Sequence, residues 1–155
     1  MAKKQETISS AGTESDIIEL IEPIEISAEE NLVAKHKDEL KLLDKMLKAQ
    51  IEKEVPSILR DQISETFSYF ARIGIWWAKS ERSYRQFQMT ASQTVPTVLK
   101  SDSRKMWLDG YCSNYRYQRD ILAHYLEGIK SKLSAQKSIL ASLNQERRDA
   151  GLDEH

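Results

Sequence analysis

The chain has little of what a disulfide-stapled or β-rich fold uses. Its 155 residues include one cysteine, five glycines and three prolines. The single cysteine, Cys112, excludes an intramolecular disulfide framework and favours a reducing compartment. So few glycines and prolines leave an all-β fold short of turn residues, whereas the abundant Leu, Lys, Glu and Gln suit helices. We therefore expect an all-α protein.

Long hydrophobic runs are absent as well. The first ten residues, MAKKQETISS, lack the apolar core of a signal peptide. No run of about 18 apolar residues occurs, so we expect no membrane-spanning helix and no membrane partner. Together with the cysteine usage, this predicts a soluble cytoplasmic protein.

Catalytic and metal-binding motifs are absent too. The three histidines, His36, His124 and His155, are far apart in the sequence, and there is no HExxH, glycine-rich phosphate loop or Gly-x-Ser-x-Gly motif. Cys112 and His124 would lie about 18 Å apart on one helix, so they could pair as nucleophile and base only between subunits. Cys112 is better explained as a small packing residue. We expect no enzyme, no metal and no cofactor.

Charge is unevenly distributed, although the net charge is only −1. Residues 1–34 carry two lysines against eight acids, whereas residues 60–148 carry fifteen Lys and Arg against eight acids, a balance of +7. A basic body with an acidic arm indicates a nucleic-acid partner or an interaction tail. Ordinary solvated helix faces are the alternative.

Residues 1–26 form the acidic arm, which we expect to be flexible or loosely attached. Its second half, DIIELIEPIEIS, mixes isoleucines with acids, and Pro23 prevents a long regular helix. Such a segment docks either on a partner or, more commonly, on the protein's own body.

Residues 27–150 form a helical domain with three predicted helices, at about 28–54, 57–90 and 103–148. Ser27 and Glu30 make a capping box that opens the first helix, and Pro56 ends it. The connector 91–100 contains Pro96 and reverses the chain, so that the last two helices pack as an elongated hairpin. Gly74 in the second helix would let another helix approach closely.

The third helix, about 45 residues long, would make a rod of about 65–70 Å, ending at Gly151. Its apolar positions repeat nearly every 3.5 residues, which favours coiled-coil-like packing. One short chain would not cover such a rod, so we expect the late part of the stripe to be an oligomerisation surface. Its residues are Leu126, Ile129, Leu133, Leu140 and Leu143.

All twelve aromatic residues lie between Phe67 and Tyr125, interleaved with basic residues. Cations neutralise phosphates and flat rings stack on unpaired bases, so the pattern favours single-stranded nucleic acid. The predicted phosphate contacts are Lys79, Arg82, Arg85, Arg116 and Arg119. The predicted stacking residues, which lie off the apolar stripes, are Trp76, Tyr115 and Tyr117. The rings on the stripes are assigned to the core instead; they are Trp77, Tyr84, Trp107, Tyr111 and Tyr125.

Residues 70–143 resemble the UvsY-type recombination mediators of tailed phages. The resemblance consists of a helix with AKSERSYRQF, a polar connector, VLKSD opening a long helix, and YLEGIKSKLSAQKSIL near its end. It implies a homo-oligomer that binds single-stranded DNA and helps to load a RecA-like recombinase in place of single-strand-binding protein. Such a phage protein would act in the host cytoplasm.

By this resemblance, Lys79, Arg82 and Arg85 contribute to DNA binding, and the ladder from Leu126 to Leu143 to assembly. The acidic arm and first helix are longer than the family pattern, and the basic cluster is sparser. Two other functions are compatible with the sequence. One is a structural or adaptor coiled-coil protein without nucleic-acid binding, and the other is a small inhibitor of a host enzyme.

Overall fold

The structure is a computed structural model that describes the backbone of residues 10–151 and the side chains of residues 14–151. Within these residues every regular element is a helix, as the sequence predicts. The six helices are α1 (Ser10–Glu19), α2 (Leu32–Lys35), α3 (Lys37–Lys48), α4 (Pro56–Ser92), α5 (Ser101–Tyr111) and α6 (Ser113–Asp149). None of them is long and apolar enough to cross a membrane. Residues 1–9 of the predicted arm, and His155, lie outside the described part.

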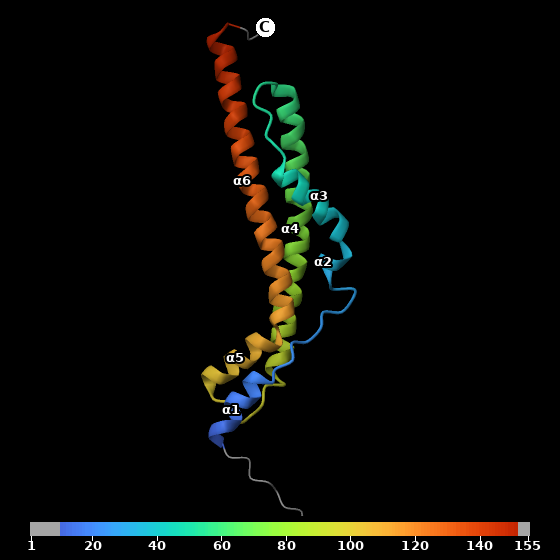
Figure 1. Ribbon diagram of the computed structural model, residues 1–155, viewed down its shortest axis with the longest axis vertical. Coiled ribbons are helices and arrows are strands. Elements are labelled where there is room, and N and C mark those ends of the chain that lie inside the picture. The colour runs from blue at the N-terminus through green and yellow to red at the C-terminus, as the bar shows by residue number, and fades with distance from the viewer. Residues whose placement is uncertain (1–9, 152–155) are drawn as a thin grey trace, which may run out of the picture.

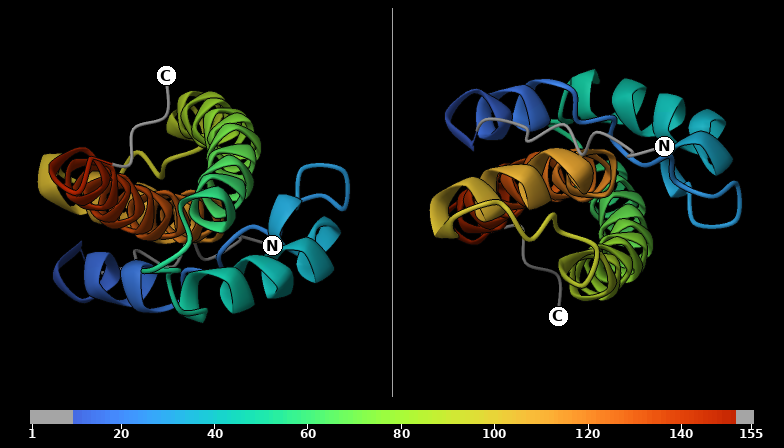
Figure 2. Two further views of the ribbon diagram at one scale, coloured as in Figure 1. Left: turned by 90° about the horizontal axis from the view of Figure 1, so that it is seen from above. Right: turned by 90° about the horizontal axis from the view of Figure 1, so that it is seen from below.

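Two long helices, α4 and α6, pack side by side as a hairpin and form the long axis of the molecule (Figure 1). The end-on views show α1, α2 and α3 together on one side of this hairpin (Figure 2). The elongated hairpin predicted from the periodicity is thereby confirmed. Each long helix has 37 residues and is about 55 Å long.

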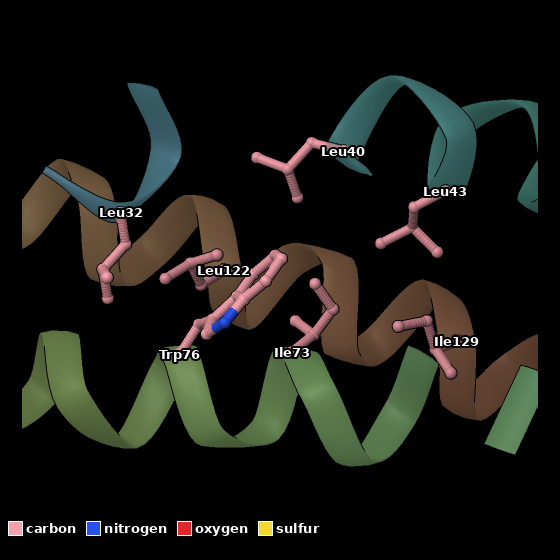
Figure 3. Close-up of a cluster of buried hydrophobic side chains, with 7 residues drawn as sticks. All are labelled: Leu32, Leu40, Leu43, Ile73, Trp76, Leu122 and Ile129. Atoms are coloured by element: carbon pink, nitrogen blue, oxygen red, sulfur yellow. The ribbon is translucent and has the colours of Figure 1, made fainter. Parts of the chain in front are cut away.

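The main core lies where α2 and α3 cover the hairpin. Leu40 and Leu43 of α3 point toward Ile73 of α4 and toward Leu122 and Ile129 of α6 (Figure 3). Leu43, Leu122 and Ile129 have no exposed surface, and Ile73 is 1% exposed. Burial of such side chains contributes about 1.5–3 kcal/mol each to stability and holds α2 and α3 onto the hairpin.

The prediction of one helix over 28–54 is wrong at both ends. The Ser27–Glu30 capping box forms, with the Glu30 N–H 3.3 Å from the Ser27 hydroxyl oxygen, but it closes only a turn. Helix α2 begins one turn later, where the Asn31 side chain accepts a hydrogen bond from the Ala34 N–H. After α3, the Glu52 carboxylate accepts hydrogen bonds from three consecutive N–H groups, which stabilises a loop before Pro56.

The end of α3 is held by Lys132 of α6. Its ammonium group donates to the carbonyl oxygens of Met46, Leu47 (3.5 Å) and Ala49 (2.7 Å). A helix C-terminus leaves its last carbonyls short of hydrogen-bond donors, and a cation there also stabilises the helix dipole. Burial lowers the pKa of Lys132.

Replacing Lys132 by methionine is expected to lower the free energy of unfolding by about 1–2 kcal/mol, because the three carbonyls lose a charged donor. Urea unfolding followed by circular dichroism measures the change. Lys130→Met is the matched control: Lys130 is exposed on the same helix and pairs with the exposed Glu127, at 3.1 Å. Its loss should stay within about 0.5 kcal/mol. Equal losses in the two variants would show that Lys132 does not cap α3.

The prediction of one continuous helix over 103–148 is also wrong, because the chain bends between α5 and α6 at Cys112 (Figure 1). The carbonyl of Tyr111 accepts a hydrogen bond from the Ile24 N–H (3.1 Å) rather than from the next helical turn. The Asn114 amide in turn donates to the Ile24 carbonyl (2.9 Å). Insertion of a foreign group into the helical hydrogen-bond ladder is a known cause of a kink.

Glycines show where helices approach closely. A Cβ on Gly128 of α6 would lie 3.4 Å from Leu47, and one on Gly110 would lie 3.3 Å from Ile21. A Cβ on Gly74, in contrast, would meet no atom within 4 Å, so the prediction that Gly74 admits a neighbouring helix is wrong. Gly151, at φ 67°, ends α6 as predicted.

Candidate nucleic-acid interface

The predicted phosphate-binding residues come from two neighbouring helices. Lys79, Arg82 and Arg85 lie in the C-terminal half of α4 and are exposed. Arg116 and Arg119 lie in the first two turns of α6 and are half-buried. Because α4 and α6 run in opposite directions, the end of one lies beside the start of the other, which brings these cations to one end of the hairpin.

Glu81 joins the two helices within this cluster. Its carboxylate lies 2.6 Å from Nε of Arg85 and 3.5 Å from Nη1 of Arg119. Arg119 also pairs with Asp120 at 2.7 Å and lies 4.6 Å from the centre of the Tyr84 ring. Burial lowers the pKa of Arg119, but the Asp120 hydrogen bond and the charges of Asp120 and Glu81 outweigh burial and raise it above its ordinary value. Arg119 is therefore a permanently charged, fixed cation.

The other cations differ in how readily a phosphate could reach them. The Arg85 side chain is 74% exposed, and an exposed ion pair such as Arg85–Glu81 contributes only about 0–1 kcal/mol, so a phosphate could displace it. In the part of the chain that the structure describes, Lys79, Arg82 and Arg116 make no ion pair. The cluster is thus partly neutralised, and Lys79, Arg82 and Arg85 are its accessible members.

The prediction that Trp76 lies off the packed faces is wrong. Trp76 is 7% exposed and stacks on His36, with ring centres 3.9 Å apart. Trp76 belongs to the same buried cluster as Leu32, Leu40 and Leu122, which come from α2, α3 and α6 (Figure 3). It is therefore not available to stack on a base.

Tyr115 was predicted as a stacking residue, and this is also wrong. It is 5% exposed, its ring stacks on Phe87 at 4.6 Å, and its hydroxyl donates to the Glu30 carboxylate at 2.8 Å. Burial, and then the hydrogen bond to Glu30, raise the pKa of Tyr115 to about 12. Tyr115 therefore anchors the segment before α2 to the start of α6.

Tyr117 remains exposed, at 69%, but it does not join the arginines. It lines a pocket of about 560 Å³ with Ala34 and Ile121, and a second pocket of about 500 Å³ with Asp44 and His124. The first pocket is lined by residues of α2, α3 and α6, and the second by Asp44 of α3 and by α6, whereas Arg119 contacts Glu81 and Tyr84 of α4. Tyr117 therefore lies on the side of α6 that borders α3, and Arg119 on the side that borders α4.

The aromatic residues near the cluster form a column instead. Trp107 stacks on Tyr111 (4.8 Å), Tyr111 on Phe87 (5.8 Å), and Phe87 on Tyr115. The column links α5, α4 and α6, and holds α5 across the end of the hairpin. The sequence placed Trp107 and Tyr111 on the apolar stripe, but the spacing alone does not show that α5 turns away from α6.

The described part of the acidic arm docks at the same end. Helix α1 lies against α5 (Figure 1), and the Ser103 hydroxyl donates to the Glu14 carboxylate at 3.2 Å. Ile24 and Ile26 pack against the cluster formed by Tyr84, Cys112 and Tyr115. The described part of the arm therefore packs at the end of the hairpin that carries the basic residues, a neighbourhood that the charge asymmetry alone did not reveal.

Two of the five residues of the predicted oligomerisation ladder are covered within one chain. Ile129 is fully buried and Leu133 is 9% exposed, so the expectation that they need another subunit is wrong. The covering helices are α3 and α4, because α4 is long enough to follow α6 past this region. Leu126, Leu140 and Leu143 are partly exposed and keep the predicted role as a hypothesis.

The fold and the cluster define a class: an all-α helical-hairpin protein with a basic end and an acidic arm folded onto it. No protein-family model, curated protein or solved structure matches the chain. Among residues 14–151 no group of His, Cys, Asp and Glu side chains is arranged to hold a metal ion.

Proposed function

We propose that this protein is a homo-oligomeric accessory protein of DNA recombination. It binds single-stranded DNA and helps to load a RecA-like recombinase in place of single-strand-binding protein, as the resemblance to UvsY-type mediators implies. The observation that carries the proposal is the convergence of Lys79, Arg82, Arg85, Arg116 and Arg119 at one end of the hairpin.

The chemistry that supports this proposal is electrostatic. Phosphate contacts supply most of the affinity in non-specific binding and release counterions. One subunit offers only a few accessible cations, so binding is weak until several subunits present their clusters along one strand. Linked sites raise the overall affinity without any new contact.

A single-strand titration tests the proposal. Removing three phosphate contacts in the triple variant Lys79→Ala, Arg82→Ala and Arg85→Ala should weaken binding and reduce the slope of log affinity against log salt by about 2. Fluorescence anisotropy with a labelled oligodeoxythymidine at 50 and 200 mM salt (roughly the range in which such contacts are resolved) measures both.

The matched control removes the same charge from the other end of the hairpin, with Lys53→Ala, Arg60→Ala and Arg147→Ala, all exposed. It should bind like the wild type. Absence of binding by the wild-type protein at low salt would exclude the proposal, and equal weakening in both triple variants would exclude this cluster as the site.

A structural or adaptor role is the second candidate, and the burial of Trp76, Tyr84 and Tyr115 supports it. In that role the rings only pack the hairpin, and Arg85 and Arg119 only bridge helices through Glu81. It predicts self-association without nucleic-acid affinity. Native mass spectrometry beside the titration separates the two functions, and a strict monomer would contradict both.

A further inference from the structure

A pocket of about 330 Å³ lies where the end of α3 meets α4 and α6, away from the basic cluster. Its walls include Lys45 and Met46 of α3, Thr66 and Tyr69 of α4, and Lys132 and Gln136 of α6. Its volume is at the lower limit of small-molecule sites, about 300–1,000 Å³, and suits a single small ligand. Neither proposed function uses this pocket.

Gln136 is the unusual residue of its wall. It is 1% exposed, and its amide oxygen has no hydrogen-bond partner within the described residues. The other buried glutamine of α6, Gln118, is fully engaged: it accepts from the Val33 N–H (3.4 Å) and donates to the Glu30 carbonyl (2.9 Å). Buried polar atoms are almost always paired, and this oxygen is free among the described residues to accept a hydrogen bond from a bound group.

The chemistry of the amide indicates what that group is. A glutamine amide presents an acceptor and a donor in one plane, and its terminal torsion is soft, so the plane can turn toward the pocket. Its complement is a flat group with an N–H donor beside an acceptor, as on the edge of adenine. The Met46 thioether and the Tyr69 ring offer surfaces on which a flat ring packs well.

The charges of the pocket extend this argument to a nucleotide. Lys45 is exposed at the pocket, and Lys132 lies in its wall. The residues that line the pocket thus include two lysines and one acidic residue, Glu65. The excess of positive charge favours an anionic ligand. We propose that the pocket binds an adenine nucleotide, with the base edge on the Gln136 amide and the phosphate toward Lys45.

This site is separate from the predicted DNA contacts. Gln136 lies seventeen positions after Arg119 on the same helix, or about 25 Å away along its axis. The ligand is either a free nucleotide or one base of a strand, and the two sources share the same edge chemistry. Lys79, Arg82 and Arg85 do not line this pocket, so the triple alanine variant should bind AMP like the wild type.

Isothermal titration of the full chain with AMP tests the proposal. Saturable binding is expected, weakened at least about tenfold in Gln136→Met, which keeps the side-chain length but removes the amide. Gln145→Met is the matched control: it makes the same substitution at an exposed glutamine of α6, and binding should be unchanged. A failure of the wild type to saturate at millimolar AMP, or equal affinity in both variants, overturns the proposal.

Four further ligands identify the chemistry and the source. If inorganic phosphate or UMP bound as tightly as AMP, the proposal that the pocket recognises the edge of adenine would be overturned. Adenosine binding more weakly than AMP supports the role of Lys45. Oligodeoxyadenosine competing with AMP identifies a strand as the source, and no competition identifies the free nucleotide. Urea unfolding shows that Gln136→Met is folded, and its midpoint should rise because the unpaired buried amide is gone.

Discussion

Replacing Ile129 by alanine is expected to lower the free energy of unfolding by about 2–5 kcal/mol. Ile129 has no exposed surface and packs with Leu43 of α3, Ile73 of α4 and Leu122 of α6. The substitution removes the free energy gained by burying the isoleucine side chain. It also leaves a cavity that the three packed helices cannot close. Urea unfolding followed by circular dichroism measures the loss.

Leu140→Ala is the control for this prediction. Leu140 belongs to the same apolar stripe but is partly exposed beyond the region that α3 covers. Its truncation should remove less than about half of the stability lost at Ile129. Native mass spectrometry of both variants completes the comparison. If Ile129→Ala kept its stability but lost an oligomer, Ile129 would be an assembly residue and the single-chain core would be refuted.

Stability is expected to fall by about 2 kcal/mol between pH 10 and about pH 12 on account of Tyr115 alone. The ordinary tyrosine pKa is 10.0, and burial and the Glu30 hydrogen bond raise that of Tyr115 to about 12. A raised folded-state pKa means that this contribution is fully present below pH 10. It is lost as pH rises toward the folded pKa, because the unfolded chain releases the proton first. Tyr125, whose pKa is also raised by burial and by Asp44, adds to the fall.

Tyr115→Phe isolates this effect. At pH 8 the variant should be less stable than the wild type by about 1 kcal/mol, because the hydrogen bond to Glu30 is lost. At about pH 11.5 the order should reverse, since phenylalanine has no proton to release. Urea midpoints at both pH values measure the crossing. Tyr117→Phe, at the exposed tyrosine of the same helix, should show no crossing; a constant difference between wild type and Tyr115→Phe would contradict the assignment.

Helix α4 is the element that the sequence predicted best. The stripe through Leu59, Ile73 and Tyr84, with Pro56 before it, predicted a helix over 57–90, and α4 spans Pro56–Ser92. The hairpin followed from the connector with Pro96, where Val95 and Leu99 are buried as the chain turns. Both inferences rest on the spacing of apolar residues and on the backbone restrictions of proline. These shape the local structure independently of which helix packs beside it.

The errors occurred where a distant segment decides the local structure. The bend at Cys112 depends on Ile24, about ninety positions earlier, which hydrogen-bonds to Tyr111 and Asn114. The end of α3 depends on Lys132, and the burial of Trp76 on His36. None of these partners can be identified from the spacing of residues within one helix.

In the candidate site, too, the sequence was informative where local properties decide and misleading where a distant segment decides. The sequence by itself determined the helical class, the two long amphipathic helices, and the concentration of arginine and lysine near residues 79–119, because helix periodicity and charge are local properties of the chain. Only the tertiary structure decided that Trp76 and Tyr115 are core, that Tyr117 borders α3 while Arg119 contacts α4, and that the buried Gln136 oxygen has no hydrogen-bond partner among the described residues. Those outcomes depend on which faces α2, α3 and the arm cover, and that packing is set by contacts between segments far apart in the sequence.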